Sequence, residues 1–403
     1  MFADNPRLSG SQLVQAREIC AEAVAMVKDR DLAVAAGELD PKFALPDANW
    51  SYDASVEYVR IFRRLAECNP LDIERLRGLA MVFTGYSLFA VSQAAGLTCS
   101  DMTFSDKFDS TVADRLREWN RPFVEEWHRV TSGLRPEAIF RPPAMLGEIG
   151  HEVDGVIVNN DTCTYQERIS LIVKSGLLDW LKNRARSGKV RICEIGGGYG
   201  ALCYWFKTAL PEASYTIVDL PESLLFSRLY LTLTRPDLRM ATGPDPETFD
   251  IRFVPNYRAD SVNEAFDLVI NTLSMSEMSE YQVRRYLAIM KKTWLRQGGL
   301  FFEQNQDNRQ VGFLFAREII GTVLPFRTEL FDGAGGFRNG YPIIWSTGPI
   351  VLGDWRPKDP VSQLDISTGA NLSARDASGS FRSSVRRKVG KVARQVFRRL
   401  GLR

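Results

Sequence analysis

The feature that most constrains the fold is a glycine-rich segment in the middle of the chain. Gly196–Gly200 reads GGGYG, follows the β-branched run at residues 190–193 and precedes an apolar, helical segment that opens at Ala201. A strand, a glycine turn and a helix place backbone N–H groups against a bound ligand, because a Cβ there would block its approach. The simpler alternative is a plain tight turn. Since Gly196, Gly198 and Ala201 also satisfy the dinucleotide fingerprint, the loop alone does not separate NAD from S-adenosylmethionine.

Two carboxylates beside this loop favour S-adenosylmethionine. Glu194 lies two residues before the first glycine. A dehydrogenase keeps an apolar residue there, whereas a carboxylate can accept from the ammonium group of a methionine moiety, which a dinucleotide lacks. Asp219 ends the next strand-like run, 25 residues later. Its two oxygens can accept from both ribose hydroxyls of either cofactor.

The region around the loop alternates between strand and helix patterns. Further strand-like runs lie at residues 215–218, 251–254, 266–270 and 299–303, with helical stretches between most of them. This alternation predicts an α/β fold with a doubly wound, Rossmann-like parallel sheet.

The chain divides into five predicted segments. We expect an all-α N-terminal domain at 1–138, a connecting segment and helix at 139–186, the sheet domain at 187–355, a flexible linker at 356–381 and a basic helical tail at 382–403. Helices are predicted over Ser11–Leu39, Asp109–Val130 and Tyr165–Arg186, the second of them kinked or interrupted at Pro122. Residues 78–100 carry no charge but include several hydroxyl, amide and glycine residues. They therefore predict a buried core helix rather than a membrane span.

Three segments of the sheet domain resemble a known family. They read VRICEIGGGYGALCYWF from Val190, SYTIVDLPESLLFSRLYL from Ser214 and FDLVINTLSMSEMSEYQVRRYL from Phe266. The pattern resembles the sugar O-methyltransferases of bacterial polysaccharide clusters, within the class I S-adenosylmethionine-dependent methyltransferases, over about residues 140–350. The resemblance implies transfer of a methyl group from S-adenosylmethionine to a hydroxyl group of a sugar or glycan acceptor.

The same resemblance assigns ligand contacts by position in the sheet domain. It implies that Glu194, Gly196, Gly198 and Gly200 hold the methionine end, Asp219 and Leu220 the ribose, Asp260 and Ser261 the adenine, and that Asn271 and Thr272 face the sulfonium and the substrate.

A sugar hydroxyl is a weak nucleophile, so this chemistry calls for a general base. The main candidates are His151, just before the sheet domain, and Glu277, in the loop after the fourth strand; His128, Asp161 and Tyr165 are lesser ones. Each also has a simpler interpretation, such as a structural histidine or, for Glu277, a carboxylate at a helix N-terminus. No metal is expected, because the fourth strand ends in an amide, Asn271, rather than in an acid.

The formal net charge of +2 conceals an uneven distribution. Between Arg382 and Arg403 there are nine Lys/Arg and no Asp/Glu, which leaves −7 for the residues before them. An acidic body argues against nucleic acid as a partner. The tail forms a basic amphipathic pattern that suits an anionic membrane surface, although a solvated tail or one docked on the body fits as well.

The six cysteines are scattered and the N-terminal residues lack an apolar signal segment. We therefore expect a cytoplasmic protein, peripheral at the inner face of the membrane if the tail binds there. Two alternatives to the transferase stay open, an NAD-dependent sugar dehydrogenase and a catalytically inactive scaffold that binds S-adenosylmethionine. The N-terminal helices either bind substrate or build a homodimer.

Overall fold

The computed structural model describes residues 7–46, 56–84, 118, 121–309, 312–329 and 340–348. The predicted linker at 356–381 and the basic tail at 382–403 lie outside these residues, as does most of the uncharged stretch after Thr84. No helix within the described ranges is both long enough and apolar enough to cross a bilayer.

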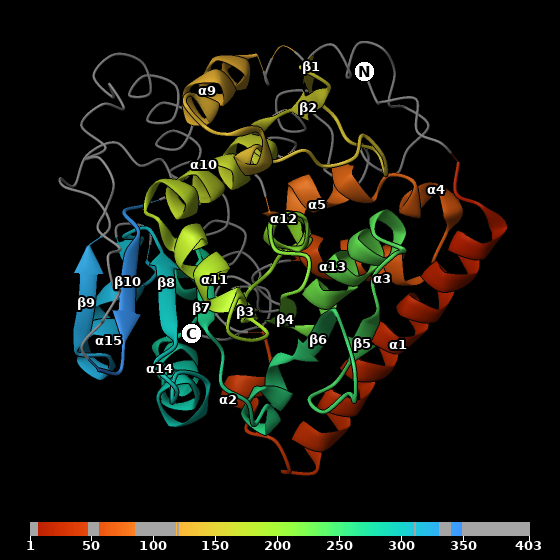
Figure 1. The fold of residues 1–403 in the computed structure, drawn as a ribbon. Helices are drawn as coiled ribbons and strands as arrows, with labels where there is room; N and C mark the ends of the chain where they lie inside the picture. Colours follow the sequence, from red (N-terminus) through yellow and green to blue (C-terminus); the bar gives the residue numbers. More distant parts are fainter. Residues whose placement is uncertain are drawn as a thin grey trace.

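The centre of the molecule is an eight-stranded sheet, which confirms the predicted α/β class (Figure 1). Its order is β5-β6-β4-β3-β7-β8-β10-β9. The strands are β3 (Arg191–Ile195), β4 (Ser214–Asp219), β5 (Met240–Thr242), β6 (Ile251–Pro255), β7 (Leu268–Thr272), β8 (Leu300–Gln304), β9 (Phe326–Glu329) and β10 (Ile343–Ser346). Strands β3 to β8 are parallel, whereas β10 runs antiparallel to both β8 and β9. Each of the five predicted strand-like runs overlaps an observed strand.

The strand order changes direction at β3. The chain first leaves β3 toward β4 and β6, and later continues on the opposite side of β3 through β7 and β8. The connections at the carboxyl ends of β3 and β7 therefore diverge, and ligands of doubly wound sheets bind in the crevice that opens at such a point. The glycine loop begins there.

Helices cover both faces of the sheet because its side chains alternate between two cores. Ile192 of β3 packs in the first core, with α10 (Asn160–Lys174), α11 (Leu177–Ala185), α12 (Ala201–Ala209) and α13 (Pro221–Thr234). The neighbouring Cys193 packs in the second core, with α14 (Glu280–Ile289), the π-helical turn η5 (Met290–Trp294) and α15 (Ala316–Val323).

The described N-terminal helices pack directly on this sheet domain. They are α1 (Gly10–Ala35), α2 (Pro41–Ala44), α3 (Val56–Ala66), α4 (Pro70–Ile73) and α5 (Leu76–Thr84). In Figure 1, α1 extends along the side of the molecule next to α13, and its buried residues belong to the same apolar core as α12 and α13. The separate N-terminal domain predicted from the sequence is thus not confirmed, although the described part of this segment is helical.

Two details differ from the expected elements, and a third concerns the helix expected over Asp109–Val130. The helix predicted over Tyr165–Arg186 is two helices, α10 and α11, because Gly176 adopts a left-handed conformation (φ +81°) between them. The irregular stretch before them contains a hairpin of β1 (His151–Val153) and β2 (Val156–Val158), after the 3-10 turn η2 (Pro136–Ala138). Helix α9 (Pro122–Thr131) begins at the proline that was expected to interrupt the helix.

Candidate functional site

The glycine loop after β3 has a backbone conformation that residues other than glycine rarely adopt. Gly196, Gly198 and Gly200 have φ values of +75°, +56° and +92°. A Cβ on Gly196 would lie 2.2 Å from the Ser274 hydroxyl oxygen, so the loop packs closely against the segment after β7. Gly200 ends the turn and precedes α12, whose first N–H groups point back toward the loop.

Glu194 lies directly beneath this loop and is buried. The Tyr215 hydroxyl donates a hydrogen bond to its Oε2 at 2.9 Å. A Cβ on Gly197 would come within 3.3 Å of the same oxygen, so the carboxylate touches the loop. Burial raises the pKa of Glu194 to about 7, against the lowering effect of the Tyr215 hydrogen bond and of the nearby Arg168. The carboxyl therefore titrates near neutral pH.

Asp219 ends β4, the neighbour of β3, and keeps part of its surface exposed. The backbone N–H of Leu220 donates to Asp219 Oδ1 at 2.8 Å. Burial is the largest influence and raises the pKa of Asp219 to about 7, while hydrogen bonds from Leu220, from the Gly198 N–H and from the Ser223 hydroxyl lower it. The contact with Gly198 ties this carboxylate to the glycine loop.

Asn271 and Thr272, the residues predicted to face the sulfonium and the substrate, are buried at the end of β7. Asn271 is fully buried, and its amide donates to Ile195 O at 2.9 Å and to the Ser274 hydroxyl at 2.6 Å. Its oxygen accepts from Met275 N at 3.2 Å and from the Asn305 amide at 2.9 Å. The side chain therefore joins the ends of β3, β7 and β8. Thr272 is also buried.

The chain leaves this connection through a strained residue. Leu273 has φ +67°, which a side chain with a Cβ rarely adopts. Sequence reasoning did not single out Leu273 or Ser274. The turn η4 (Ser274–Glu277) follows and holds Ser274 against Gly196.

The residues predicted at the adenine lie on the surface. Asp260 and Ser261 are exposed in the 3-10 turn η3 (Asn256–Ser261), and Asp260 accepts from Arg285 at 2.9 Å. The first residue of that turn, Asn256, is buried instead. Its amide donates to Phe43 O at 2.8 Å, and its Oδ1 has no hydrogen-bond partner among the described residues.

The candidate bases occupy different places. Glu277 is half-buried in η4, next to the loop, whereas His151 is half-buried on the hairpin strand β1. His128 is exposed on α9, and Asp161 accepts from the buried Arg77 at 3.2 Å. Burial raises the pKa of Tyr165, so this phenol does not suit a base.

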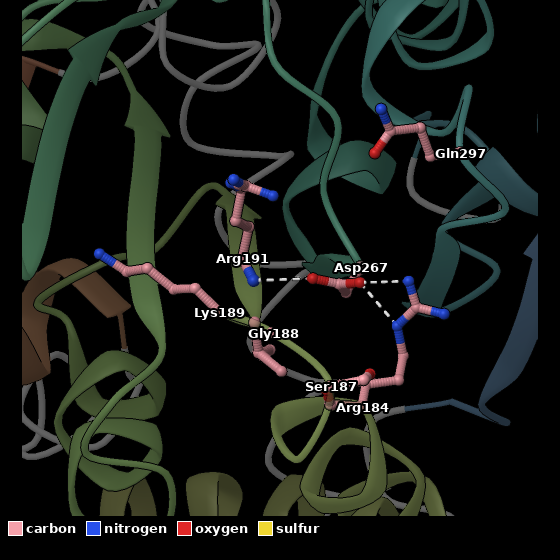
Figure 2. Close-up of a pocket in the computed structure, with 8 residues that line it drawn as sticks. Arg184, Ser187, Gly188, Lys189, Arg191, Asp267 and Gln297 are labelled. Atoms are coloured by element: carbon pink, nitrogen blue, oxygen red, sulfur yellow. Dashed lines mark hydrogen bonds and ion pairs between the residues drawn. The ribbon is translucent and has the colours of Figure 1, made fainter.

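A cavity lies at the opposite end of the strands, at the amino ends of β3 and β7 (Figure 2). It has a volume of about 300 Å³, and the carboxylate in its lining, Asp267, already accepts from Arg184 at 2.6 Å and from the Arg191 N–H at 2.9 Å. This places it far from the glycine loop. Within the described part of the chain, no three His, Cys, Asp or Glu side chains gather as a metal site would require.

Several solved structures match part of this chain at low similarity, and three of the proteins among them carry the word methyltransferase in their names. Magnesium protoporphyrin IX methyltransferase (ChlM) from Synechocystis PCC 6803, with bound SAM, has a TM-score of 0.31 and 12% identity over 58% of this chain and 94% of that chain. The bifunctional kinase-methyltransferase WbdD has a TM-score of 0.30 and 18% identity over 45% of this chain and 39% of that chain. CalS10, an amino pentose methyltransferase from Micromonospora echinaspora, has a TM-score of 0.24 and 18% identity over 34% of this chain and 50% of that chain.

The chain thus spans half or less of the WbdD and CalS10 chains. No protein-family model matches the sequence, and no curated protein matches it significantly.

Proposed function

We propose that this protein is an S-adenosylmethionine-dependent methyltransferase that acts on a sugar hydroxyl. The observation that carries the proposal is the position of Glu194, a buried carboxylate touching the glycine loop at the point where the strand order reverses. A carboxylate at this place can accept hydrogen bonds from the ammonium group of a methionine moiety. A dinucleotide has no ammonium group that the carboxylate could bind. The sugar acceptor rests on the resemblance of the three sequence segments.

The residues at this edge fit the cofactor. At the carboxyl ends of two strands of the sheet, a buried side chain has a polar atom that lacks a hydrogen-bond partner among the described residues; these atoms are Asn256 Oδ1 after β6 and Gln304 Oε1 at the end of β8. Buried polar atoms in native proteins are nearly always paired, so each of these two atoms leaves a hydrogen bond that a ligand can complete.

Each part of the cofactor has a candidate partner. Glu194 and the N–H groups of the loop would hold the methionine end, and Asp219 the ribose hydroxyls. For the adenine amino group we propose Asn256 in place of Asp260, because the Asn256 oxygen is an unpartnered acceptor whereas Asp260 is exposed and paired with Arg285.

When bound, S-adenosylmethionine supplies a methyl group for in-line displacement, in which the acceptor oxygen bonds to the methyl carbon as the carbon–sulfur bond breaks. The chain must then take the proton of the hydroxyl. We propose Glu277 as this base, since it lies on η4, whose first residue, Ser274, packs on Gly196. His151 is the alternative, from the hairpin.

The test compares ligands first and variants second. Calorimetry should show binding of S-adenosylhomocysteine and none of NAD; the reverse result would establish the dehydrogenase alternative. Transfer of radiolabelled methyl groups is then measured on nucleotide sugars, lipid-linked sugars and glycans. Replacing the base should lower kcat about 100-fold or more, so Glu277→Gln and His151→Asn identify which residue acts. Binding without transfer to any of these acceptors would support the inactive scaffold.

A further inference from the structure

Arg77 is a fully buried arginine on α5, far from the glycine loop in sequence but in contact with it in the fold. Its Nε donates to Glu148 Oε2 at 2.6 Å and its Nη2 to Glu148 Oε1 at 3.2 Å. The same Nη2 donates to Asp161 Oδ2 at 3.2 Å. The Asn159 amide also donates to Glu148, at 2.6 Å. These contacts fix the plane of the guanidinium group.

The face of this guanidinium lies on the ring of Tyr199, with 3.6 Å between the Arg77 Cζ and the ring centroid. Two more aromatic rings contact Tyr199 in edge-to-face geometry. The ring centroid of Tyr165 lies 5.3 Å from that of Tyr199, and the centroid of Tyr230 lies 4.9 Å from it. Arg77 Nη1 has no hydrogen-bond partner among the described residues. Hydrogen bonds thus satisfy Nε and Nη2 of Arg77 but not Nη1, and the contact with the Tyr199 ring is the further interaction of this buried guanidinium.

Tyr199 is the one residue of the loop Gly196–Gly200 that has a side chain. Gly198 and Gly200 on either side of it have positive φ and no side chain, so Tyr199 makes the only side-chain contacts of this loop. A flexible loop binds a ligand more weakly because its ordering opposes binding. Part of the rigidity of the loop therefore depends on what holds Tyr199.

We propose that Arg77 is a positioning residue for the cofactor: by stacking on Tyr199 it holds the glycine loop in its binding conformation. This inference rests on the proposed function. It makes the N-terminal helices part of the cofactor site, because α5 supplies the guanidinium and the sheet domain supplies the tyrosine on which it stacks.

The experiment measures the Kd of S-adenosylhomocysteine for the full chain by calorimetry. Arg77→Lys keeps the positive charge but loses the planar stack and the bidentate geometry, and should raise Kd about tenfold or more. Arg252→Lys is the matched control. Arg252 is also buried and hydrogen-bonded, to Thr216 at 2.9 Å, but lies on β6 and contacts Phe249 rather than the loop. The Kd of the Arg252→Lys variant for S-adenosylhomocysteine should stay within about twofold of the wild-type value.

A double-mutant cycle separates positioning from a general loss of stability. Tyr199→Leu removes the ring and should weaken binding by itself, whereas Tyr199→Phe keeps the ring and should bind like the wild type. In the Tyr199→Leu background, Arg77→Lys should cause little further loss of affinity, because both changes remove the same contact between Arg77 and Tyr199. Additive losses, or an unchanged Kd in Arg77→Lys, would overturn the proposal.

Two further outcomes are informative. Should Arg77→Lys fail to fold, Glu148→Gln takes its place: it loosens the guanidinium while keeping its charge, and should raise Kd about threefold. A wild-type Kd in a folded Glu148→Gln protein would then overturn the proposal. Failure of the wild-type protein to bind S-adenosylhomocysteine would instead refute the proposed function.

Discussion

Glu194 and Asp219 should make cofactor affinity depend on pH near neutrality. Burial raises the pKa of both carboxyls to about 7 in the free protein. An ammonium group beside Glu194 and ribose hydroxyls on Asp219 are bound by the ionised forms. Below pH 7 each carboxyl holds a proton that binding must release, so affinity falls as the pH falls through 7.

The size of the effect follows from the fraction of ionised carboxyl. With a pKa of about 7, roughly nine-tenths of the carboxyl is ionised at pH 8 and about one-tenth at pH 6, and the apparent Kd varies inversely with that fraction. One carboxyl therefore accounts for about a tenfold weaker binding of S-adenosylhomocysteine at pH 6 than at pH 8, and both together for up to about 100-fold.

Calorimetry between pH 5.5 and 8, in buffers of different ionisation enthalpy, measures both Kd and the number of protons released. The wild type should release protons on binding at pH 6. Glu194→Gln should bind more weakly at pH 8 and lose part of the pH dependence. A Kd that is constant from pH 6 to 8, with no proton release, would refute the assignment of these carboxyls to the cofactor.

The unliganded protein offers an independent check on the same pKa. Glu194 ionises near 4.5 in the unfolded chain but near 7 in the fold, so the unfolded state binds fewer protons between these values. Stability therefore falls as the pH rises from 5 to 8, by about 3 kcal/mol from this group. Glu194→Gln should remove that part of the decrease in urea denaturation measured at both pH values.

Three further results are expected. Asp219→Asn should weaken S-adenosylhomocysteine binding about tenfold or more by calorimetry, because the amide offers one acceptor oxygen in place of two; unchanged binding would place the ribose elsewhere. Gly196→Ala should lower the free energy of unfolding by about 1–3 kcal/mol in urea, and adding Ser274→Gly should recover only part of it, because the clash is relieved but the positive φ is not. Arg30→Met should destabilise the fold by about 3–5 kcal/mol, since it leaves the buried Glu222 without the guanidinium that donates to it at 3.0 Å. The double variant with Glu222→Leu should regain most of this loss, and equal stability of both variants would show that the pair is not coupled.

The sequence predicted five of the six parallel strands, β3, β4, β6, β7 and β8, because each is a short apolar run. The three-residue β5 was missed, as were β9 and β10, since nothing in the local pattern of the last two shows that they pair antiparallel beside β8. The break at Gly176 was missed for a different reason. A single glycine in a helical pattern is often tolerated, and only the packing of α10 and α11 decides that this one adopts a positive φ.

At the site, too, the sequence predicts the position of a residue better than the contacts of its side chain. Strand ends place Glu194, Asp219 and Asn271 at one edge of the sheet, and this much follows from the sequence. Whether a side chain at that edge faces a ligand depends on its partners, which come from distant parts of the chain. Asn271 hydrogen-bonds to Ser274 and Asn305, two partners that its position at a strand end does not reveal.

The dependence of the loop on Arg77 shows why local motifs underestimate such a site. A motif reports the residues that touch the ligand, because these share a strand, a turn and a helix. The residues that fix the turn can come from anywhere, and a buried guanidinium needs both an acceptor pair and an aromatic face to be held. In this chain Glu148 and Asp161 supply the acceptors and Tyr199 the face. Only the fold brings these three together with Arg77, so a glycine loop found by its motif should be examined for the helix that packs on its one side chain.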